Sequence, residues 1–158
     1  MHPIASAVYR LVLALWVGGM SVFTFLVTPV IFQTQTRDRA GEIVGALFPV
    51  YFRFCMGAAV IALAARAAAG EAFSGARQLA GTFLVVLSLA IVSYHTFGLA
   101  PRMEALRETV VSMETTPKED PARRDFSRLH GISMALNLAV IAAGVILILG
   151  YDSFRRSP

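Results

Sequence analysis

The chain has 158 residues, which is the length of a single domain. Its residues are 56% hydrophobic and only 15% charged, whereas soluble domains carry about 25% charged residues, so the composition excludes an ordinary water-soluble globule. The net charge is +4, but the Lys and Arg residues flank long apolar blocks and do not form one patch. That distribution is typical of loops beside membrane spans and argues against a nucleic-acid-binding surface.

The first apolar block predicts a membrane-spanning helix. Crossing the hydrocarbon takes about 20 apolar residues, and the uncharged run from Leu11 to Thr36 exceeds that length, so we predict a span over residues 5–32. Gly18-Gly19 in its middle lets another helix approach closely. Pro29 predicts a kink, whose freed carbonyl needs another donor. Trp16 lies too deep for an interfacial belt, so we expect it to pack in the bundle or to line a cavity.

The second apolar block predicts a span over residues 48–69, preceded by a short polar linker over residues 33–45. Phe48-Pro49 favours a helix start here, because proline is tolerated in the first turn of a helix. Arg53 and Arg66 lie near the two ends of this span. Both side chains can therefore snorkel toward the headgroups.

The third and fourth blocks predict spans over residues 78–101 and 128–151, which contain no Asp, Glu, Lys or Arg in their apolar cores. The connection over residues 102–127 has apolar residues at alternating spacings of three and four, at Met103, Leu106, Val110 and Met113. That spacing predicts an amphipathic helix that extends the third span and ends at Thr116-Pro117. Asp120-Pro121 is typical of a helix N-cap followed by a first-turn proline. We therefore expect an all-α bundle of four transmembrane helices with a protruding hairpin between the third and fourth.

Four crossings place both termini on one side of the membrane and the linkers over residues 33–45 and 102–127 on the other. These two linkers hold more Lys and Arg than the terminal side does, which favours a cytoplasmic location for them. The protein is thus expected in the inner (cytoplasmic) membrane of a bacterium. Tyr9 and Tyr51 lie near the predicted interfaces, where aromatic residues anchor spans.

Polar residues inside the apolar blocks gather on two helix faces. The fourth span has three at spacings i, i+3 and i+7: His130, Ser133 and Asn137. The third span has four residues at i, i+7, i+10 and i+14: Ser88, His95, Gly98 and Arg102. Polar groups in hydrocarbon need partners, so both faces are expected to point inward. They meet toward the side of the two basic linkers, with Arg53 nearby.

The two intramembrane histidines, His95 and His130, permit three interpretations. They can form interhelical hydrogen bonds that hold the packing, bind heme or a transition metal, or relay protons or substrate along a polar path. No HxxxH, CxxC or CxxM spacing supports a metal site, and the single cysteine, Cys55, has no partner in the chain for a disulfide. We therefore expect no cofactor, with heme or copper at His95 and His130 as the alternative.

Four stretches resemble the small four-helix membrane proteins related to human transmembrane protein 205, a family of unknown function. They are LALWVGGMSVFTFLVTPVIF, AGEIVGALFPVYF, APRMEALR and FSRLHGISMALNL. The resemblance implies a shared site or packing node near one membrane side, because most of the matching positions lie there. The matching positions include Trp16, Gly18, Gly19, Pro29, Pro49, Tyr51, Arg102, His130, Ser133 and Asn137. A more distant likeness links the chain to copper-resistance D proteins and to a heme-biosynthesis oxidase family, although the fuller ligand set expected for copper is missing.

These observations favour a non-enzymatic membrane protein for transport or interaction, with a small polar intramembrane site. No catalytic set is visible. The residues expected to line or flank the site are His130, Asn137, Ser133, Arg102, His95, Arg53 and Trp16. Two alternatives remain open: a heme- or copper-binding redox protein, and a scaffold that docks a partner through residues 102–127. Besides the bilayer, the expected partners are a small-molecule or metal substrate and a second copy of the chain, through small-residue faces at Gly18-Gly19 and Gly57-Ala58-Ala59.

Overall fold

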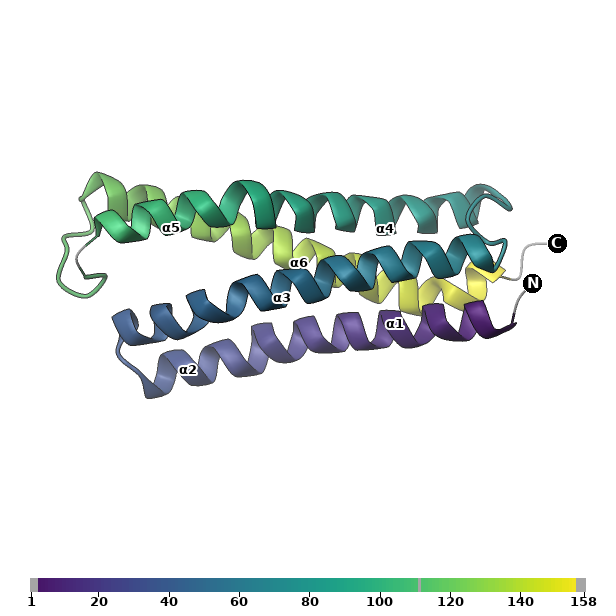
Figure 1. Ribbon diagram of the computed structural model, residues 1–158, viewed down its shortest axis with the longest axis horizontal. Coiled ribbons are helices and arrows are strands. Elements are labelled where there is room, and N and C mark those ends of the chain that lie inside the picture. Colours follow the sequence, from purple (N-terminus) through teal and green to yellow (C-terminus); the bar gives the residue numbers. More distant parts are fainter. Residues whose placement is uncertain (1–2, 111, 156–158) are drawn as a thin grey trace.

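Helices and turns make up the part of the chain that the computed structural model describes, residues 3–110 and 112–155 (Figure 1). The elements in chain order are α1 (Pro3–Val22), the π-helix η1 (Phe23–Val27), α2 (Thr28–Thr34), α3 (Arg37–Ala68), α4 (Ala76–Tyr94), the π-helix η2 (His95–Leu99), α5 (Ala100–Thr109) and α6 (Pro121–Arg155). They join into 4 rods that are each long and apolar enough to cross a membrane. The predicted all-α membrane bundle is therefore confirmed.

The rods form a ring in which each one packs against its two neighbours. Helix α1 contacts α3 and α6, and α4 contacts the same two helices. The start of α1 and the end of α6 lie at one end of the bundle, and the loop between α5 and α6 lies at the other (Figure 1). Large apolar side chains cover the outside, with Phe25 61%, Phe97 72% and Leu149 77% exposed. Such a surface requires lipid as its solvent.

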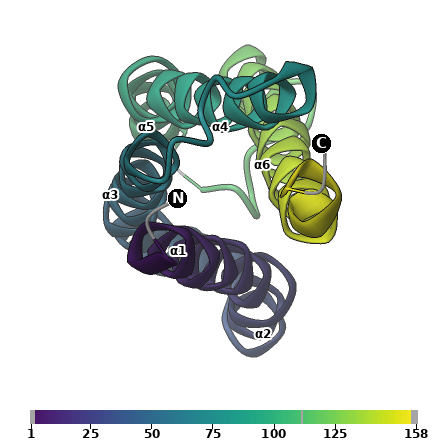
Figure 2. The same ribbon diagram turned by 90° about the vertical axis from the view of Figure 1, so that its right-hand side faces the viewer.

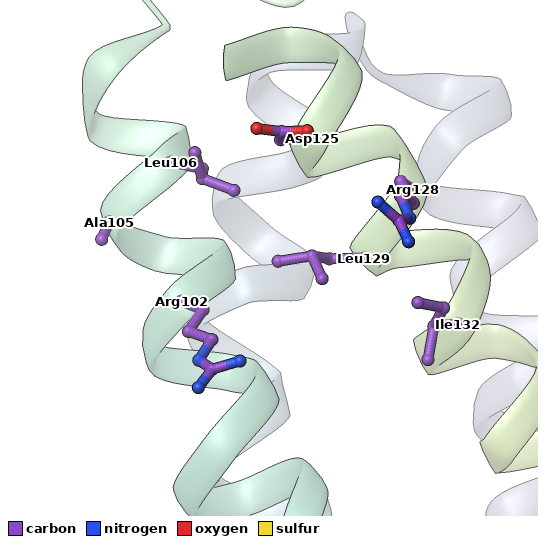
Figure 3. A pocket seen from close by; sticks show the side chains of 7 residues that line it. All are labelled: Arg102, Ala105, Leu106, Asp125, Arg128, Leu129 and Ile132. Carbon is purple, nitrogen blue, oxygen red and sulfur yellow. The ribbon is translucent and has the colours of Figure 1, made fainter. Parts of the chain in front are cut away.

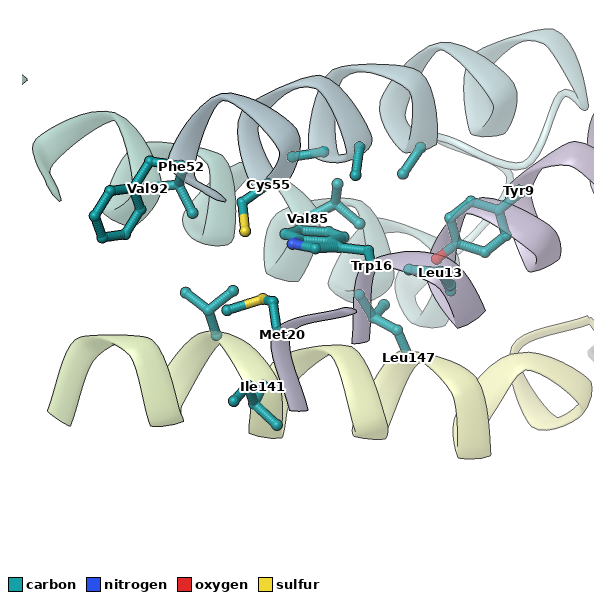
Figure 4. Close-up of a cluster of buried hydrophobic side chains, with 14 of the residues drawn as sticks. Tyr9, Leu13, Trp16, Met20, Phe52, Cys55, Val85, Val92, Ile141 and Leu147 are labelled. Atoms are coloured by element: carbon teal, nitrogen blue, oxygen red, sulfur yellow. The ribbon is translucent and has the colours of Figure 1, made fainter. Parts of the chain in front are cut away.

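Small residues on α3 allow large residues of α1 to fill the middle of the ring (Figure 4). Trp16 is only 1% exposed, as expected for a residue that packs inside the bundle. The α1 face with Tyr9, Leu13, Trp16 and Met20 repeats every three or four residues, which places all four on one side of the helix. On α3 the facing surface is rich in alanine: Ala58, Ala59, Ala62 and Ala65. Close approach of backbones is the usual basis of helix packing in lipid.

The predicted start of the second helix at Phe48-Pro49 is wrong. Helix α3 begins at Arg37 and holds Pro49 in its interior, so the polar linker shrinks to a break at residues 35–36. The true start has a cap, because the side chain of Thr36 accepts a hydrogen bond from Arg39 N at 3.4 Å. Proline is tolerated inside a membrane helix where neighbouring groups satisfy the freed backbone.

Each π-helix stands just before a proline, and the first accounts for the predicted kink at Pro29. In η1 the carbonyl of Phe23 accepts hydrogen bonds from the backbone N–H and the hydroxyl of Thr28, the latter at 2.9 Å. In η2 the carbonyl of His95 accepts from the N–H of Ala100, directly before Pro101. A π-turn contains one residue more than an α-turn, so each helix is rotated beyond this point.

The α5–α6 connection differs in part from the prediction. Helix α5 does extend the third span, but it ends at Thr109 and does not continue to Thr116. The following residues fold back over the start of α3, where Asp38 accepts hydrogen bonds from Ser112 Oγ at 2.5 Å and Met113 N at 2.6 Å. Helix α6 begins at Pro121 as predicted. Its cap is the carboxylate of Asp120, which accepts from Arg123 N at 3.0 Å.

Arg66 does not snorkel, because its side chain is only 1% exposed. Its guanidinium donates to Thr82 Oγ1 at 3.1 Å, to the hydroxyl of Tyr9 at 3.2 Å, and to both oxygens of Gln78 at 2.8 and 3.0 Å. Gly81 makes room for it, since a Cβ there would come within 3.0 Å of Arg66 Nη2. Tyr9 is likewise buried and holds this cluster instead of anchoring the span at an interface.

Candidate functional site

Five polar side chains from all four rods meet inside the bundle toward the end that holds the α5–α6 loop. We call them the polar cluster: Thr24 of η1, Tyr51 of α3, His95 of η2, and Ser133 and Asn137 of α6. Both π-helices contribute a member. π-turns are frequent at functional sites because they redirect side chains without ending the helix.

Asn137 joins three rods through its amide. Its Oδ1 accepts a hydrogen bond from the hydroxyl of Tyr51 at 2.6 Å, and its Nδ2 donates to Thr24 Oγ1 at 2.9 Å. The ring of Tyr51 stacks on Phe23, with ring centroids 4.4 Å apart. The amide of Asn137 is thus held in one orientation, with both its oxygen and its nitrogen in use.

His95 makes one weak polar contact and keeps one polar atom unpaired. Its Nδ1 lies 3.4 Å from Ser133 Oγ, and its ring stacks on Phe52 with centroids 4.8 Å apart. The side chain is 2% exposed, yet Nε2 has no hydrogen-bond partner. A buried polar atom without a partner costs free energy, and in native structures such an atom often marks a functional group.

The polar cluster lies where the ring of helices is least closed. Past the π-turn, α2 contacts α3 but has no Cα within 8 Å of α6. Figure 2 shows α2 turned away from the rest of the ring, whereas α1 is in contact with α6. The hydrogen bond between Thr24 and Asn137 joins η1 to α6 just before α2 begins.

Two predicted site residues, Arg102 and Arg53, do not reach the polar cluster. Arg102 shares a face with His95 only in a regular α-helix. The π-turn of η2 inserts one residue between them, and a helix rotates by about 100° per residue. Arg102 consequently points to the outside, where it lines a surface pocket between α5 and α6. Arg53 is also exposed, and its Nε donates to the carbonyl of Pro49 at 3.0 Å.

The other predicted residues divide between the cluster and its surroundings. His95, Ser133 and Asn137 are members. The ring of His130 lies parallel to Phe126 of the same helix at 6.1 Å, one turn nearer the loop than Ser133. Trp16 is deeper in the core, and its indole nitrogen points toward the sulfur atoms of Cys55 and Met20 (Figure 4).

Within the described part of the chain, no group of three or more His, Cys, Asp or Glu side chains could hold a metal ion.

Tyr51 and Thr24 belong to the cluster although the sequence did not single them out for it. Tyr51 was expected at an interface, but only 9% of it is exposed and its hydroxyl points to Asn137. The sequence feature that could have indicated its inward direction is its position two residues before Arg53. Residues two apart lie on nearly opposite helix faces, so an outward Arg53 requires an inward Tyr51.

Comparison with known proteins identifies one matching family. Residues 11–112 match the family described as "Domain of unknown function (DUF4149)", a stretch from α1 through α5 that includes Thr24, Tyr51 and His95. An uncharacterized protein of Aquifex aeolicus (strain VF5) is 29% identical over 139 residues, which covers 87% of this chain and 90% of that protein. No solved structure matches the chain.

Proposed function

The chain belongs to the family described as "Domain of unknown function (DUF4149)", and for this member we propose that it transports a small polar or amphipathic molecule. The molecule would enter between α2 and α6 and bind at the polar cluster. The observation that carries the proposal is the unpaired, buried Nε2 of His95 in a cluster where Ser133 contacts the same ring and Asn137, one turn further along α6, is preorganised. Unpaired polar groups in a membrane interior are costly, and they are typically kept for substrates, ions or protons.

The interior is narrow, which limits what the protein can carry. Core residues close in sequence to members of the cluster include Met20, Phe52 and Val140, all less than 10% exposed, and Phe52 stacks directly on the ring of His95. A substrate larger than a few heavy atoms would therefore need to keep its apolar part in the lipid and present only a polar head to Asn137 and His95. The divergence of α2 from α6 supports such lateral entry.

Cysteine reactivity tests whether polar molecules reach the cluster. In a chain with Cys55→Ala, we expect Ser133→Cys to react with the membrane-impermeant reagent methanethiosulfonate ethylsulfonate in proteoliposomes. The matched control is Met134→Cys, one residue along α6 and 53% exposed toward lipid, which should not react. Absence of reaction at position 133 would contradict an accessible site.

Transport is tested in proteoliposomes with defined probes. Urea and glycerol carry hydrogen-bonding groups of the kind that Asn137 can recognise, and a pyranine-loaded vesicle reports proton movement, the task for which histidine is best suited. We expect at least one probe to move faster than in empty vesicles and the effect to be lost in Asn137→Leu. If none of the three probes moved faster in vesicles with the protein than in empty vesicles, transport of this class of molecule would be contradicted.

A second candidate, a heme- or copper-binding redox protein, rests on the same free nitrogen, since Nε2 is the common ligand atom of histidine. His130 would have to supply the second ligand, yet its ring lies against Phe126. We expect the purified protein to be colourless and metal-free. An absorbance band of heme, or about one metal per chain, that is lost in His95→Phe would favour this candidate instead.

The proposal includes a location in the bacterial inner membrane with the α2–α3 and α5–α6 connections in the cytoplasm. The basic residues of these connections and the bacterial relative support it. Reporter fusions at the two ends of the chain test the orientation.

We also propose a relationship to the proteins related to transmembrane protein 205. This relationship predicts that their structures contain a hydrogen bond equivalent to that between Tyr51 and Asn137.

A further inference from the structure

A basic pocket lies on the outside of the bundle between α5 and α6 (Figure 3). Its volume is about 570 Å³, and we call it the arginine pocket. Its lining residues are Arg102, Ala105, Leu106, Asp125, Arg128, Leu129 and Ile132. Figure 3 shows the guanidinium groups of Arg102 and Arg128 on facing helices, with Leu129 between them.

Both arginines are free to bind an anion. Neither has a hydrogen bond or ion pair with any residue that the structure describes, Asp125 of the same pocket included. The ion pair found among the described residues joins Arg39 and Glu42 elsewhere. The arginine pocket therefore has an excess of one positive charge, and its guanidinium groups keep all their donors available.

The exposed apolar residues on the same helices imply that the arginine pocket lies at the depth of lipid headgroups. Phe97, 72% exposed, is five residues before Arg102, and Ile132, 40% exposed, is four residues after Arg128. At a rise of about 1.5 Å per residue, each arginine stands about 6–8 Å above an apolar side chain that faces the acyl chains. The pocket thus presents charge at the level of the phosphates and apolar surface below it.

We propose that the arginine pocket binds the phosphate of an anionic phospholipid. Guanidinium groups bind phosphate oxygens with paired hydrogen bonds, and basic pockets between membrane helices recognise anionic headgroups. A soluble phosphate ester shares this chemistry but would leave Leu129 and Ile132 uncovered. The acyl chain of a lipid covers both, which is why the lipid is the favoured occupant. This inference does not depend on the proposed transport function.

Native mass spectrometry of the detergent-solubilised chain tests the proposal, with phosphatidylglycerol and phosphatidylcholine as probes. We expect wild type to retain phosphatidylglycerol in preference to phosphatidylcholine. Arg102→Gln and Arg128→Gln should each weaken phosphatidylglycerol binding by about fivefold, because one basic residue near the surface contributes about that much to anionic-lipid binding. Arg124→Gln is the matched control, since Arg124 is exposed on the same helix but does not line the pocket.

Three results would overturn the proposal. The double variant could bind phosphatidylglycerol as wild type does, or Arg124→Gln could weaken binding as much as the pocket variants do. In the third, glycerol 1-phosphate added as a soluble competitor could displace the lipid at equal concentration, which would assign the pocket to a soluble phosphate. Unchanged thermal unfolding of each variant in a zwitterionic detergent establishes that a loss of lipid binding is not a loss of fold.

Discussion

The hydroxyl of Tyr51 donates a hydrogen bond of 2.6 Å to Oδ1 of Asn137, and the Nδ2 of the same amide donates to Thr24. One side chain of α6 is thereby bonded to both α3 and η1. These are the rods next to the place where α2 turns away from α6, so Asn137 links three rods beside that place.

Replacing Asn137 with leucine should lower the stability of the bundle. Asn137→Leu removes both hydrogen bonds and leaves the hydroxyls of Tyr51 and Thr24 without this partner. Interhelical hydrogen bonds in membranes are each worth about 0.6 kcal/mol on average, so we expect a loss of about 1–2 kcal/mol. Unfolding in mixed detergent micelles, followed by Trp16 fluorescence, measures it. Met134→Leu on the lipid-facing side should change little, and an equal effect of the two variants would contradict this role.

Arg66 should be more important for stability than Arg53, although both stand in the same apolar block. Arg66→Leu removes a buried guanidinium with four hydrogen bonds. Hydrogen bonds to charged groups contribute about 1.5–3 kcal/mol, and part of the gain offsets the cost of burial, so we expect a net loss of about 2–3 kcal/mol. Arg53→Leu should be nearly neutral because that side chain is exposed. The same unfolding experiment compares them, and equal losses would refute the assignment.

Gly144 should not tolerate alanine, whereas Gly131 on the same helix should. A Cβ at Gly144 would collide with Cγ2 of Val17, a β-branched side chain on α1 with little freedom to move. Overpacking of this kind costs about 1–3 kcal/mol. A Cβ at Gly131 has no atom within 4 Å, and alanine is the better helix former. Thermal unfolding should therefore separate the two variants in opposite directions. A stable Gly144→Ala would mean that α1 and α6 are not in close contact.

Docking of the α5–α6 loop on α3 should depend on pH. Hydrogen bonds from the hydroxyl of Ser112 and the N–H of Met113 hold the pKa of Asp38 below its ordinary value of 3.8, with smaller contributions from Arg107 and Arg123. A lowered pKa means that the ionised form is favoured in the docked state. The stabilisation is therefore complete above pH 3.8 and is lost as the pH falls through the lower, docked pKa. The protection factor of the Met113 amide, which compares its hydrogen exchange with the intrinsic rate at the same pH, should fall over that range.

An uncharged side chain at position 38 should release the α5–α6 loop at neutral pH, as acid does in the wild type. Asp38→Asn removes the charge that Met113 N and Ser112 Oγ bind. We expect faster tryptic cleavage after Lys118, which lies in the loop. Glu108→Gln is the control, because Glu108 is exposed on α5 and has no bond to the loop. Cleavage at the wild-type rate in Asp38→Asn would show that the loop is held by other contacts.

The inward direction of Asn137 and Ser133 could be predicted from the sequence, whereas the outward direction of Arg102 could not. The first two stand on a regular helix, where spacing alone determines which residues share a face. Between His95 and Arg102 the chain takes a π-turn. Nothing in the local spacing reveals the extra residue, so Arg102 was predicted on the wrong face. The same limit applies to Pro49. Local rules place it at a helix start, whereas in the structure it lies inside α3.

By itself, the sequence determined that four apolar helices cross a membrane and that polar residues on the third and fourth helices turn inward. Both outcomes follow from lipid as the solvent, because a polar side chain is costly where it faces lipid and a helix must be apolar over about 20 residues to cross the hydrocarbon. Only the tertiary structure decided which polar groups meet. Two π-turns rotate the helices, a glycine opposite Arg66 makes room for its charge, and α2 leaves the ring. Each of these features depends on contacts between residues far apart in the chain, and the local spacing of residues does not predict such contacts.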